Sequence, residues 1–223
     1  MKKVVFICSI VFISISLKGQ GIAGFSLQGF VPTGELRQDS PDIWGGGFTF
    51  EGGYKLPNAP IIVGANIDFI RYGSKLRKGF HGPFLGDVRF RRNFEAIRFL
   101  PFIRLQPNQS GKVLPYGDFY TGLSYIMTRS TIRERNLDLI DSYVELDNAV
   151  LSYGFGGGIE VMLDDFVSLD FNVRYIRSGR ARYLTANDVT YNSEAGLYDL
   201  DIQNSRFNTI TFGVGIKVIL SEL

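Results

Sequence analysis

The segment FVSLDFNVRY, residues 166–175, alternates between polar and apolar side chains almost without error. Ser168, Asp170, Asn172 and Arg174 interleave with an apolar set. Because successive side chains of a strand point to opposite faces, this segment would present one polar and one apolar face. The same period of two residues returns about eight times along the chain. This pattern is typical of a transmembrane β-barrel, in which lipid-facing and lumen-facing residues alternate.

The alternating segments and the turn residues between them predict eight strands. We expect these strands at residues 22–31, 44–56, 61–72, within 88–106, at 114–128, 150–163, 165–177 and 207–220. The connections alternate between long and short, and the long ones are 33–43, 73–87, 129–149 and 179–205. Short turns at one end and long loops at the other are typical of outer-membrane barrels. The sequence therefore predicts an all-β, eight-stranded antiparallel up-and-down transmembrane β-barrel, with a soluble lipocalin-like barrel as the main alternative.

Two parts of this pattern leave alternatives open. Pro101 lies inside the fourth strand, where proline is tolerated at a bulge or a locally unpaired position. The charged stretch 129–148 contains Ile132, Leu137 and Leu139, whose spacing fits either a short helix or a longer hairpin.

The N-terminus has the pattern of a secretory signal peptide. Lys2 and Lys3 precede an apolar stretch, and small residues follow at 19–21. The apolar stretch is shorter than the roughly 20 residues that a membrane helix needs, and no later run approaches that length. We therefore expect a signal peptide over residues 1–20 and an outer-membrane β-barrel over 21–223.

Composition excludes several classes of function. The sole cysteine, Cys8, lies in the leader, so the mature chain has no disulfide and no thiolate nucleophile. Loss of the leader removes three of the 24 basic residues and leaves 21 against 22 acidic ones. A nearly neutral chain gives no indication of a nucleic-acid partner. We expect no cofactor.

His81 is the only histidine and lies in the second long connection. It could act as a general base in a lipid A-modifying barrel enzyme, but no residue nearby forms a recognisable triad motif. One histidine without cysteine does not build a transition-metal site, and Asp138 with Asp141 would hold Ca²⁺ only weakly. The sequence therefore predicts a protein that is not an enzyme and has no metal site.

The inward half of the alternation carries charges of both signs. The expected interior network comprises five acids, Glu51, Asp68, Asp118, Glu160 and Asp170, and four bases, Arg98, Arg104, Arg174 and Lys217. An eight-stranded barrel has an interior that side chains can just fill, and buried charges need partners. We therefore expect a salt-bridge network that plugs the barrel, rather than a selectivity lining for a narrow pore.

Glycine and tyrosine mark the two faces of the expected barrel. Gly154, Gly156 and Gly158 face inward and would make room for large neighbours such as Tyr120 or Arg174. Four outward tyrosines are expected at the membrane–water interface. They are Tyr54, Tyr125, Tyr153 and Tyr175.

The segments Leu105-Gln106-Pro107, 114–118 (LPYGD) and 122–125 (GLSY) are similar to turns and strands of Bacteroidota-type outer-membrane barrels, as is Gln20 after the leader. Over its mature length the chain resembles the small outer-membrane proteins related to the OmpA transmembrane domain and the opacity-type porins. The resemblance implies an eight-stranded barrel. The chain departs from it at the end, where Ser221-Glu222-Leu223 follows Leu220 in place of a final aromatic residue.

The expected role is structural or an interaction mediated by the four long connections. The expected partners are outer-membrane lipid and an extracellular or secretion-machinery protein, and the barrel is expected to be a monomer. Tyr183, Tyr191 and Tyr198 would suit contact with a partner, or would pack the last loop down. The alternatives are a narrow small-solute porin and a lipid A-modifying enzyme.

Overall fold

The computed structural model describes residues 20–41, 43–82, 85–107, 111–134, 139–192 and 197–220. Within these ranges it describes the side chains as well, except at residues 77–88, 134–139 and 191–199. Their elements are β1 (Gln20–Pro32), α2 (Glu35–Asp39), β2 (Gly45–Lys55), β3 (Ile61–Gly82), β4 (Leu85–Leu105), β5 (Val113–Glu134), β6 (Leu139–Met162), β7 (Val167–Ser178), β8 (Arg180–Tyr183), β9 (Val189–Asn192), β10 (Leu197–Leu200), β11 (Gln203–Arg206) and β12 (Thr209–Leu220).

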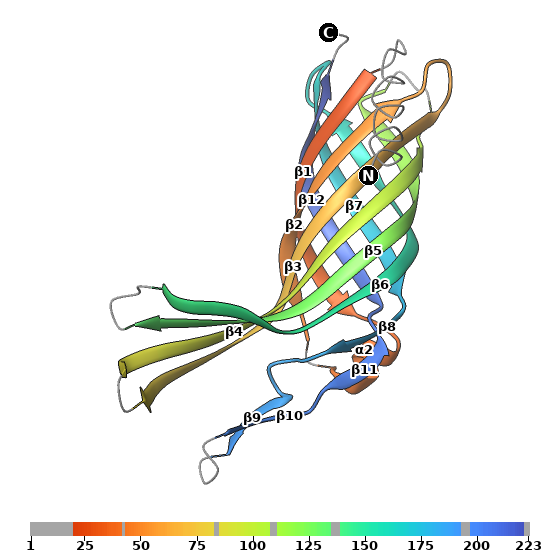
Figure 1. The fold of residues 1–223 in the computed structure, drawn as a ribbon. Coiled ribbons are helices and arrows are strands. Elements are labelled where there is room, and N and C mark those ends of the chain that lie inside the picture. The colour runs from red at the N-terminus through yellow and green to blue at the C-terminus, as the bar shows by residue number, and fades with distance from the viewer. Residues whose placement is uncertain are drawn as a thin grey trace, which may run out of the picture.

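Eight of these strands form a closed antiparallel barrel in the order β1-β12-β7-β6-β5-β4-β3-β2 (Figure 1). Neighbours in the barrel are also neighbours in sequence, except that β12 pairs with β7 and closes on β1. The predicted eight-stranded up-and-down barrel is confirmed. No helix in the described part of the chain is long and apolar enough to cross a membrane.

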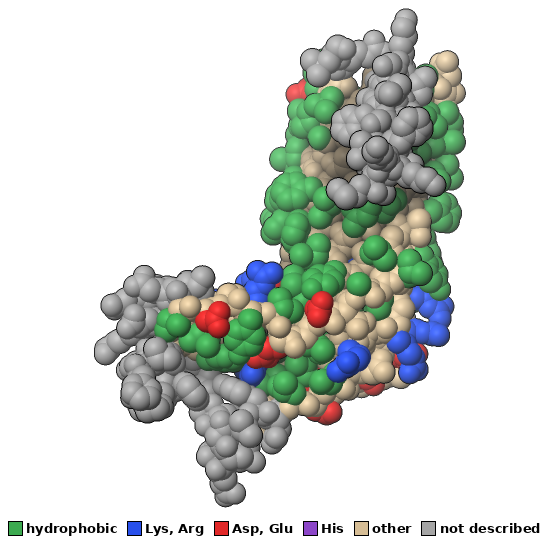
Figure 2. Space-filling view, viewed as in Figure 1, with side chains coloured by type: hydrophobic (Ala, Val, Ile, Leu, Met, Phe, Trp, Pro, Cys, Tyr) green, Lys and Arg blue, Asp and Glu red, His purple; other side chains and the backbone are tan. Residues whose placement is uncertain are grey.

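The outer wall of the barrel is apolar. Large hydrophobic side chains are exposed on successive strands, among them Leu27, Phe50, Phe119, Leu151 and Phe212, at 50–72% of their full accessible surface. Figure 2 shows this surface along the visible face of the barrel. Soluble monomers rarely expose contiguous apolar patches larger than a few hundred Å². A continuous apolar wall is the surface that a transmembrane barrel presents to lipid.

The connections at the two ends of the barrel differ, as the sequence predicted. Short connections at 56–60, 106–112 and 163–166 lie at one end, here called the turn end, together with Gln20 and Leu220. The four segments that the sequence predicted as long connections lie at the other end, here called the loop end (Figure 1).

Two of the four predicted loops are largely strand. β3 continues to Gly82 and β4 begins at Leu85, so the connection predicted at 73–87 is a hairpin. In the same way β5 and β6 extend through most of 129–149, which makes the longer hairpin correct and the short helix wrong. β4 also runs unbroken from Leu85 to Leu105, whereas the sequence pattern left the limits of the strand within 88–106 open. On its β5 side the paired residues pass from Phe99 directly to Phe102, so Pro101 occupies a locally unpaired position.

The extended ends of β3, β4, β5 and β6 form one four-stranded sheet, here called the arm (residues 73–82, 85–93, 129–134 and 139–144). Figure 1 shows it turning sideways from the barrel axis. Two register shifts lie where the arm begins, and the extra residues are Tyr72 in β3 and Glu145 in β6. A bulge bends its strand and increases the local twist, which explains the turn at this level.

The first and last connections build a cap over the loop end. The segment 33–43 contains the short helix α2, which begins after Gly34 at a φ of 59°, a conformation that favours glycine. The segment 179–205 contains two small hairpins, β8 with β11 and β9 with β10, rather than a structureless loop. These hairpins and α2 lie together below the barrel in Figure 1.

Candidate functional site: the filled interior and the cap

All nine charged side chains expected in the interior lie inside the barrel wall. Eight are buried at 6% exposure or less, and the side chain of Glu51 is 10% exposed. They divide into a network of six residues, a separate ion pair and one isolated arginine. The network consists of Glu51, Arg104, Asp118, Glu160, Asp170 and Lys217.

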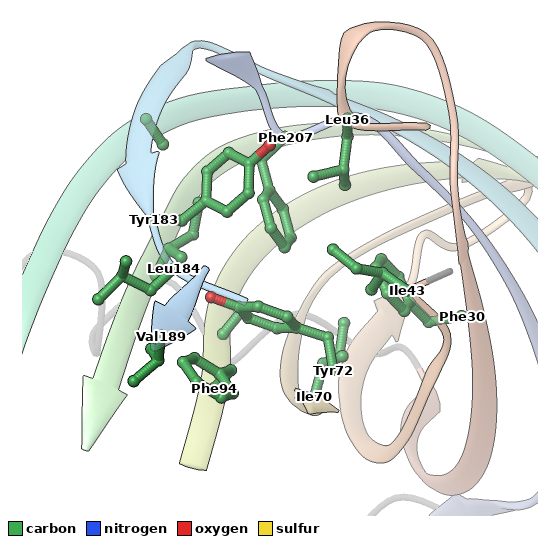
Figure 3. Packing of buried hydrophobic residues seen from close by; sticks show 13 residues of the cluster. Phe30, Leu36, Ile43, Ile70, Tyr72, Phe94, Tyr183, Leu184, Val189 and Phe207 are labelled. Atoms are coloured by element: carbon green, nitrogen blue, oxygen red, sulfur yellow. The ribbon is translucent and has the colours of Figure 1, made fainter. Parts of the chain in front are cut away.

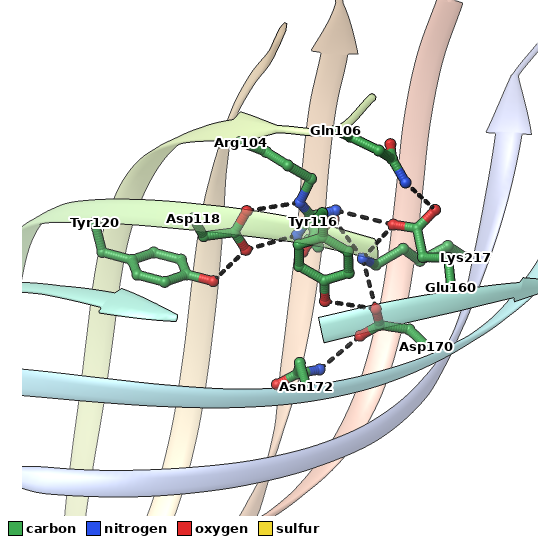
Figure 4. Close-up of polar contacts among 10 residues, drawn as sticks. Arg104, Gln106, Tyr116, Asp118, Tyr120, Glu160, Asp170, Asn172 and Lys217 are labelled. Carbon is green, nitrogen blue, oxygen red and sulfur yellow. Dashed lines mark hydrogen bonds and ion pairs between the residues drawn. The ribbon is translucent and has the colours of Figure 1, made fainter. Parts of the chain in front are cut away.

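Arg104 and Lys217 are the two cations of this network (Figure 4). The Arg104 guanidinium donates to Asp118 at 2.8 and 2.9 Å, to Glu51 at 2.8 and 2.9 Å, and to Glu160 at 3.2 Å. Lys217 Nζ lies 2.8 Å from Glu160, 2.9 Å from Asp170 and 3.5 Å from Glu51. Each carboxylate therefore has a cationic partner, which is the condition for burying charge without a large desolvation cost.

Tyr116 fills the space between the two cations. Its ring lies 4.0 Å from the Arg104 guanidinium carbon and 4.4 Å from Lys217 Nζ, and its hydroxyl donates to Asp170 at 2.6 Å. A cation over an aromatic face is attracted by the ring quadrupole, so the ring contributes to neutralisation as well as to packing. Sequence reasoning missed Tyr116, although it lies two residues before Asp118 and therefore shares its inward face.

The separate ion pair joins Arg174 to Asp68 at 3.2 Å. Arg174 also donates to the side-chain oxygens of Gln28 at 2.7 Å and Thr49 at 3.0 Å. Thr49 in turn donates to Asp68 at 2.8 Å and accepts a hydrogen bond from Gln28. Four strands are therefore linked across the lumen by one guanidinium group.

Arg98 is inside the barrel as expected but does not join the ion pairs. It is fully buried, and its Nη2 donates to Thr209 Oγ1 at 2.9 Å. Its cross-strand neighbour is Asp68, yet no ion pair joins these two described residues. Arg98 Nε and Nη1 have no hydrogen-bond partner among the described residues. Among the described residues, Arg98 therefore lies apart from the ion pairs that the other eight interior charges form.

Little space is left around these side chains. The cavity within the charged interior has a volume of about 10 Å³ and is lined by Glu51, Arg104, Tyr116, Asp170 and Arg174, among others. A single water molecule needs about this much room. The cavity at this level therefore has room for about one water molecule.

Two of the inward glycines make room for large side chains. An added Cβ would lie 2.8 Å from Arg174 Cγ at Gly156 and 2.6 Å from the Tyr116 hydroxyl at Gly158. The expected accommodation of Arg174 is therefore present. At Gly158 the neighbour is Tyr116 rather than Tyr120.

An apolar cluster lies at the loop end of the barrel (Figure 3). Its buried members come from the barrel wall and from the cap. They are Phe30, Leu36, Ile43, Ile70, Tyr72, Phe94, Ala96, Ile126, Ala181, Tyr183, Leu184, Val189 and Phe207. Phe207 is central, since its ring lies 5.2–6.1 Å from the rings of Phe30, Tyr72 and Tyr183. The cluster packs the cap onto the barrel mouth.

A polar contact also ties the arm to the cap. Lys75 of β3 donates to the carbonyl oxygens of Ala186, at 2.8 Å, and Val189. At the base of the arm, Arg92 forms a bidentate pair with Glu145 at 2.7 and 2.9 Å. The arm therefore has defined contacts where it leaves the barrel.

The loop residues that the sequence suggested for partner contact, catalysis or metal binding are only partly described. Tyr183 is 1% exposed and shares a 2.9 Å hydrogen bond with Ser205, so it packs the cap and is not a contact residue for a partner. The side chains of Tyr191, Tyr198, His81 and Asp138 lie outside the described residues.

The outward tyrosines lie on the barrel exterior. Tyr153 is 55% exposed, and the exterior Tyr125 donates to Asp147 at 2.7 Å near the loop end. A tyrosine with an apolar ring and a hydrated tip suits the membrane–water interface.

No family model matches this sequence, and no curated protein matches it either. Among solved structures, the chain is similar to a major outer membrane protein from Thermus thermophilus, with 13% identity over 89% of this chain and 99% of that one, at a TM-score of 0.50. Neisserial surface protein A matches with 13% identity over 92% and 97% of the two chains, at a TM-score of 0.45. At these identities the likeness concerns the fold alone, that of small outer-membrane β-barrels.

Proposed function

We propose that this protein is a sealed outer-membrane barrel that presents its cap and arm at the cell surface for interaction. The observation that carries this proposal is the filled interior, in which Arg104, Lys217 and Arg174 bind the carboxylates of the inward face around a cavity of about 10 Å³. A barrel of this kind offers no route for a solute, so its working surface lies outside the lumen. Export through a signal peptide over residues 1–20 and a monomeric state belong to the same proposal.

The shape of the loop end supports this role. A substantial part of the described chain lies beyond the apolar wall, as four extended strands, two small hairpins and one helix. Binding residues occur preferentially on connections that a rigid scaffold positions. The cluster around Phe207 and the contacts of Lys75 hold the cap and the arm in place, so they can present a defined surface.

Orientation follows from the difference between the two ends. Outer-membrane barrels have short periplasmic turns and longer extracellular loops. We therefore place the turn end in the periplasm and the loop end outside the cell. Protease added to intact cells should cleave within 179–206 before it cleaves the connections at 56–60 or 106–112; the reverse order would contradict this placement.

Single-channel recording in planar bilayers tests the sealed interior. The purified protein should give no stable openings, because displacement of the Arg104 network would leave charges unpaired in a low-dielectric interior. Reproducible unit conductance in the wild type would support the narrow porin instead. In the same preparation, a folded barrel should migrate differently on a gel before and after boiling, which verifies that the sample is folded.

The enzymatic alternative has a separate test. Mass spectrometry of lipid A from cells with and without the protein should show identical species. A modification that appears with the wild type and disappears in a His81→Ala variant would overturn the assignment as a non-enzyme.

A further inference from the structure

A groove lies on the outer wall of the barrel where the arm turns away. Its volume is about 450 Å³, and strands β2, β3, β4 and β5 line it. Its lining includes the apolar side chains of Phe48, Phe69, Ile97 and Met127, the cationic ones of Arg71 and Arg129, and the acidic one of Glu95, which is paired with Arg71. The groove therefore joins the apolar outer wall to a charged rim.

The register shows which face of the arm borders this groove. Phe69, Ile97 and Phe99 face lipid, and residues two apart along a strand share a face. Along β4 this face carries Arg89, Arg91 and Glu95. The arm turns sideways from the barrel wall (Figure 1), and the groove is lined by residues of this face where the turn occurs, so this face of the arm would be turned to the membrane surface.

The membrane-facing side of the arm is rich in arginine. Along β5 it carries Arg129 and Arg133, and Arg133 lies directly opposite Arg89 of β4. Like charges directly opposite on a sheet are destabilising unless an anion lies near them. No acidic partner for Arg89, Arg91 or Arg133 occurs among the side chains that the structure describes.

The two rim arginines of the groove have limited internal pairing. Arg71 binds Glu95 at 2.6 Å but is 55% exposed, and Arg129 contacts the Met127 sulfur at 3.8 Å. Arg91 and Arg129 are both exposed. Arg129 lies opposite Asn93, which is two residues from Arg91 on the same face of β4, so the two arginines are diagonal neighbours on that face. Guanidinium groups bind phosphate in a bidentate manner and are weakly hydrated, which suits them to this position.

We propose that the groove and the arm face bind an anionic, phosphate-bearing lipid of the surrounding leaflet. An acyl chain would lie against Phe48, Phe69 and Ile97, and the headgroup phosphate would be held by Arg129 and Arg91. The lipid offers both chemistries that the surface presents, an apolar chain and a negative charge at the interface. This inference rests on the proposed function only in that the barrel spans a membrane.

The test compares lipids retained by the mature protein in nanodiscs of equal parts phosphatidylcholine and phosphatidylglycerol. Native mass spectrometry after extraction counts each lipid on the wild type, on the double variant Arg91→Gln/Arg129→Gln and on the control Arg37→Gln/Arg182→Gln. The control removes the same charge from exposed arginines of the cap. A Lys or Arg near an anionic surface contributes about 1 kcal/mol, equivalent to roughly fivefold in binding.

The wild type and the control should retain phosphatidylglycerol in preference to phosphatidylcholine. The Arg91→Gln/Arg129→Gln variant should lose that preference by about tenfold or more. Equal retention of the two lipids by the wild type, or an unchanged preference in the variant, would overturn the proposal.

Two further measurements separate this proposal from the proposed function. Heat-dependent gel migration should be the same for all three proteins, which shows that each barrel is folded. Insertion into vesicles of phosphatidylcholine alone should also be the same. A protein that inserts into no vesicle would contradict the membrane assignment itself, whereas insertion without lipid preference contradicts only the lipid site.

Discussion

Arg104 and Asp118 face each other directly across β4 and β5 and form two parallel hydrogen bonds, from Nε to Oδ1 at 2.8 Å and from Nη2 to Oδ2 at 2.9 Å. Both side chains are 1% exposed. The same guanidinium binds Glu51 and Glu160, so removal of one cation would leave several carboxylates without a full set of partners.

An Arg104→Met variant should therefore be strongly destabilised. We expect the free energy of unfolding to fall by about 3–5 kcal/mol, because uncompensated buried charge remains. Denaturant unfolding in detergent micelles measures the effect. Arg180→Met, which removes an exposed pair with Glu35 at 3.5 Å, is the control and should change the value by less than about 1 kcal/mol.

The origin of that loss can be tested with the carboxylates. Asp118→Asn and Glu51→Gln added to Arg104→Met should recover part of the lost free energy, because the unpaired charges are removed together with their partner. If the triple variant is less stable than Arg104→Met alone, packing of the arginine stem rather than charge would be the main contribution.

Gly158→Ala should destabilise the barrel through a steric clash. The added Cβ would lie 2.3 Å from the Phe171 carbonyl oxygen and 2.6 Å from the Tyr116 hydroxyl. Overpacking of this kind costs about 1–3 kcal/mol. Gly52→Ala is the matched control, since nothing lies within 4 Å of its Cβ position, and thermal unfolding should show little change or a small gain.

Phe207→Ala should loosen the cap without opening the barrel. Phe207 is fully buried against Phe30, Tyr72 and Tyr183, whereas the charged network of the interior does not include it. Limited proteolysis should become faster within 179–206 while heat-dependent migration persists. The exposed Ile202 provides the control: Ile202→Ala should leave proteolysis unchanged. Equal rates in both variants would mean that the cluster does not hold the cap.

Adjacent residues of β5 should report on opposite faces of the arm. The mature chain lacks cysteine if the leader is removed, so single labels can be placed by Thr131→Cys and Ile132→Cys. Thr131 shares a face with Arg129 and Arg133, whereas Ile132 lies on the other. A fluorescent label at 131 should be quenched more by lipid-attached quenchers than one at 132. Equal quenching at both positions would place the arm away from the membrane.

Local patterns were enough to predict the barrel and its inward charges. The alternation through Asp118, Glu160 and Asp170 identified their face correctly, because a period of two residues is a property of each strand alone. The half of the arm at residues 73–87 was missed, since Gly and Lys in this segment weaken β-propensity and pairing with neighbouring strands overrode it. The bend could not be read at all, because a bulge exists only relative to a partner strand.

The sequence by itself determined the fold and the polarity of each face, because alternation is repeated within every strand. Only the tertiary structure decided which charges meet: Arg104 and Glu51 are 53 residues apart, and Arg174 and Asp68 are 106 apart. The tertiary structure alone also places Arg98 beside Thr209, apart from the ion pairs, and packs Phe30 against Phe207. These contacts depend on the register and closure of the whole barrel, which no single segment contains.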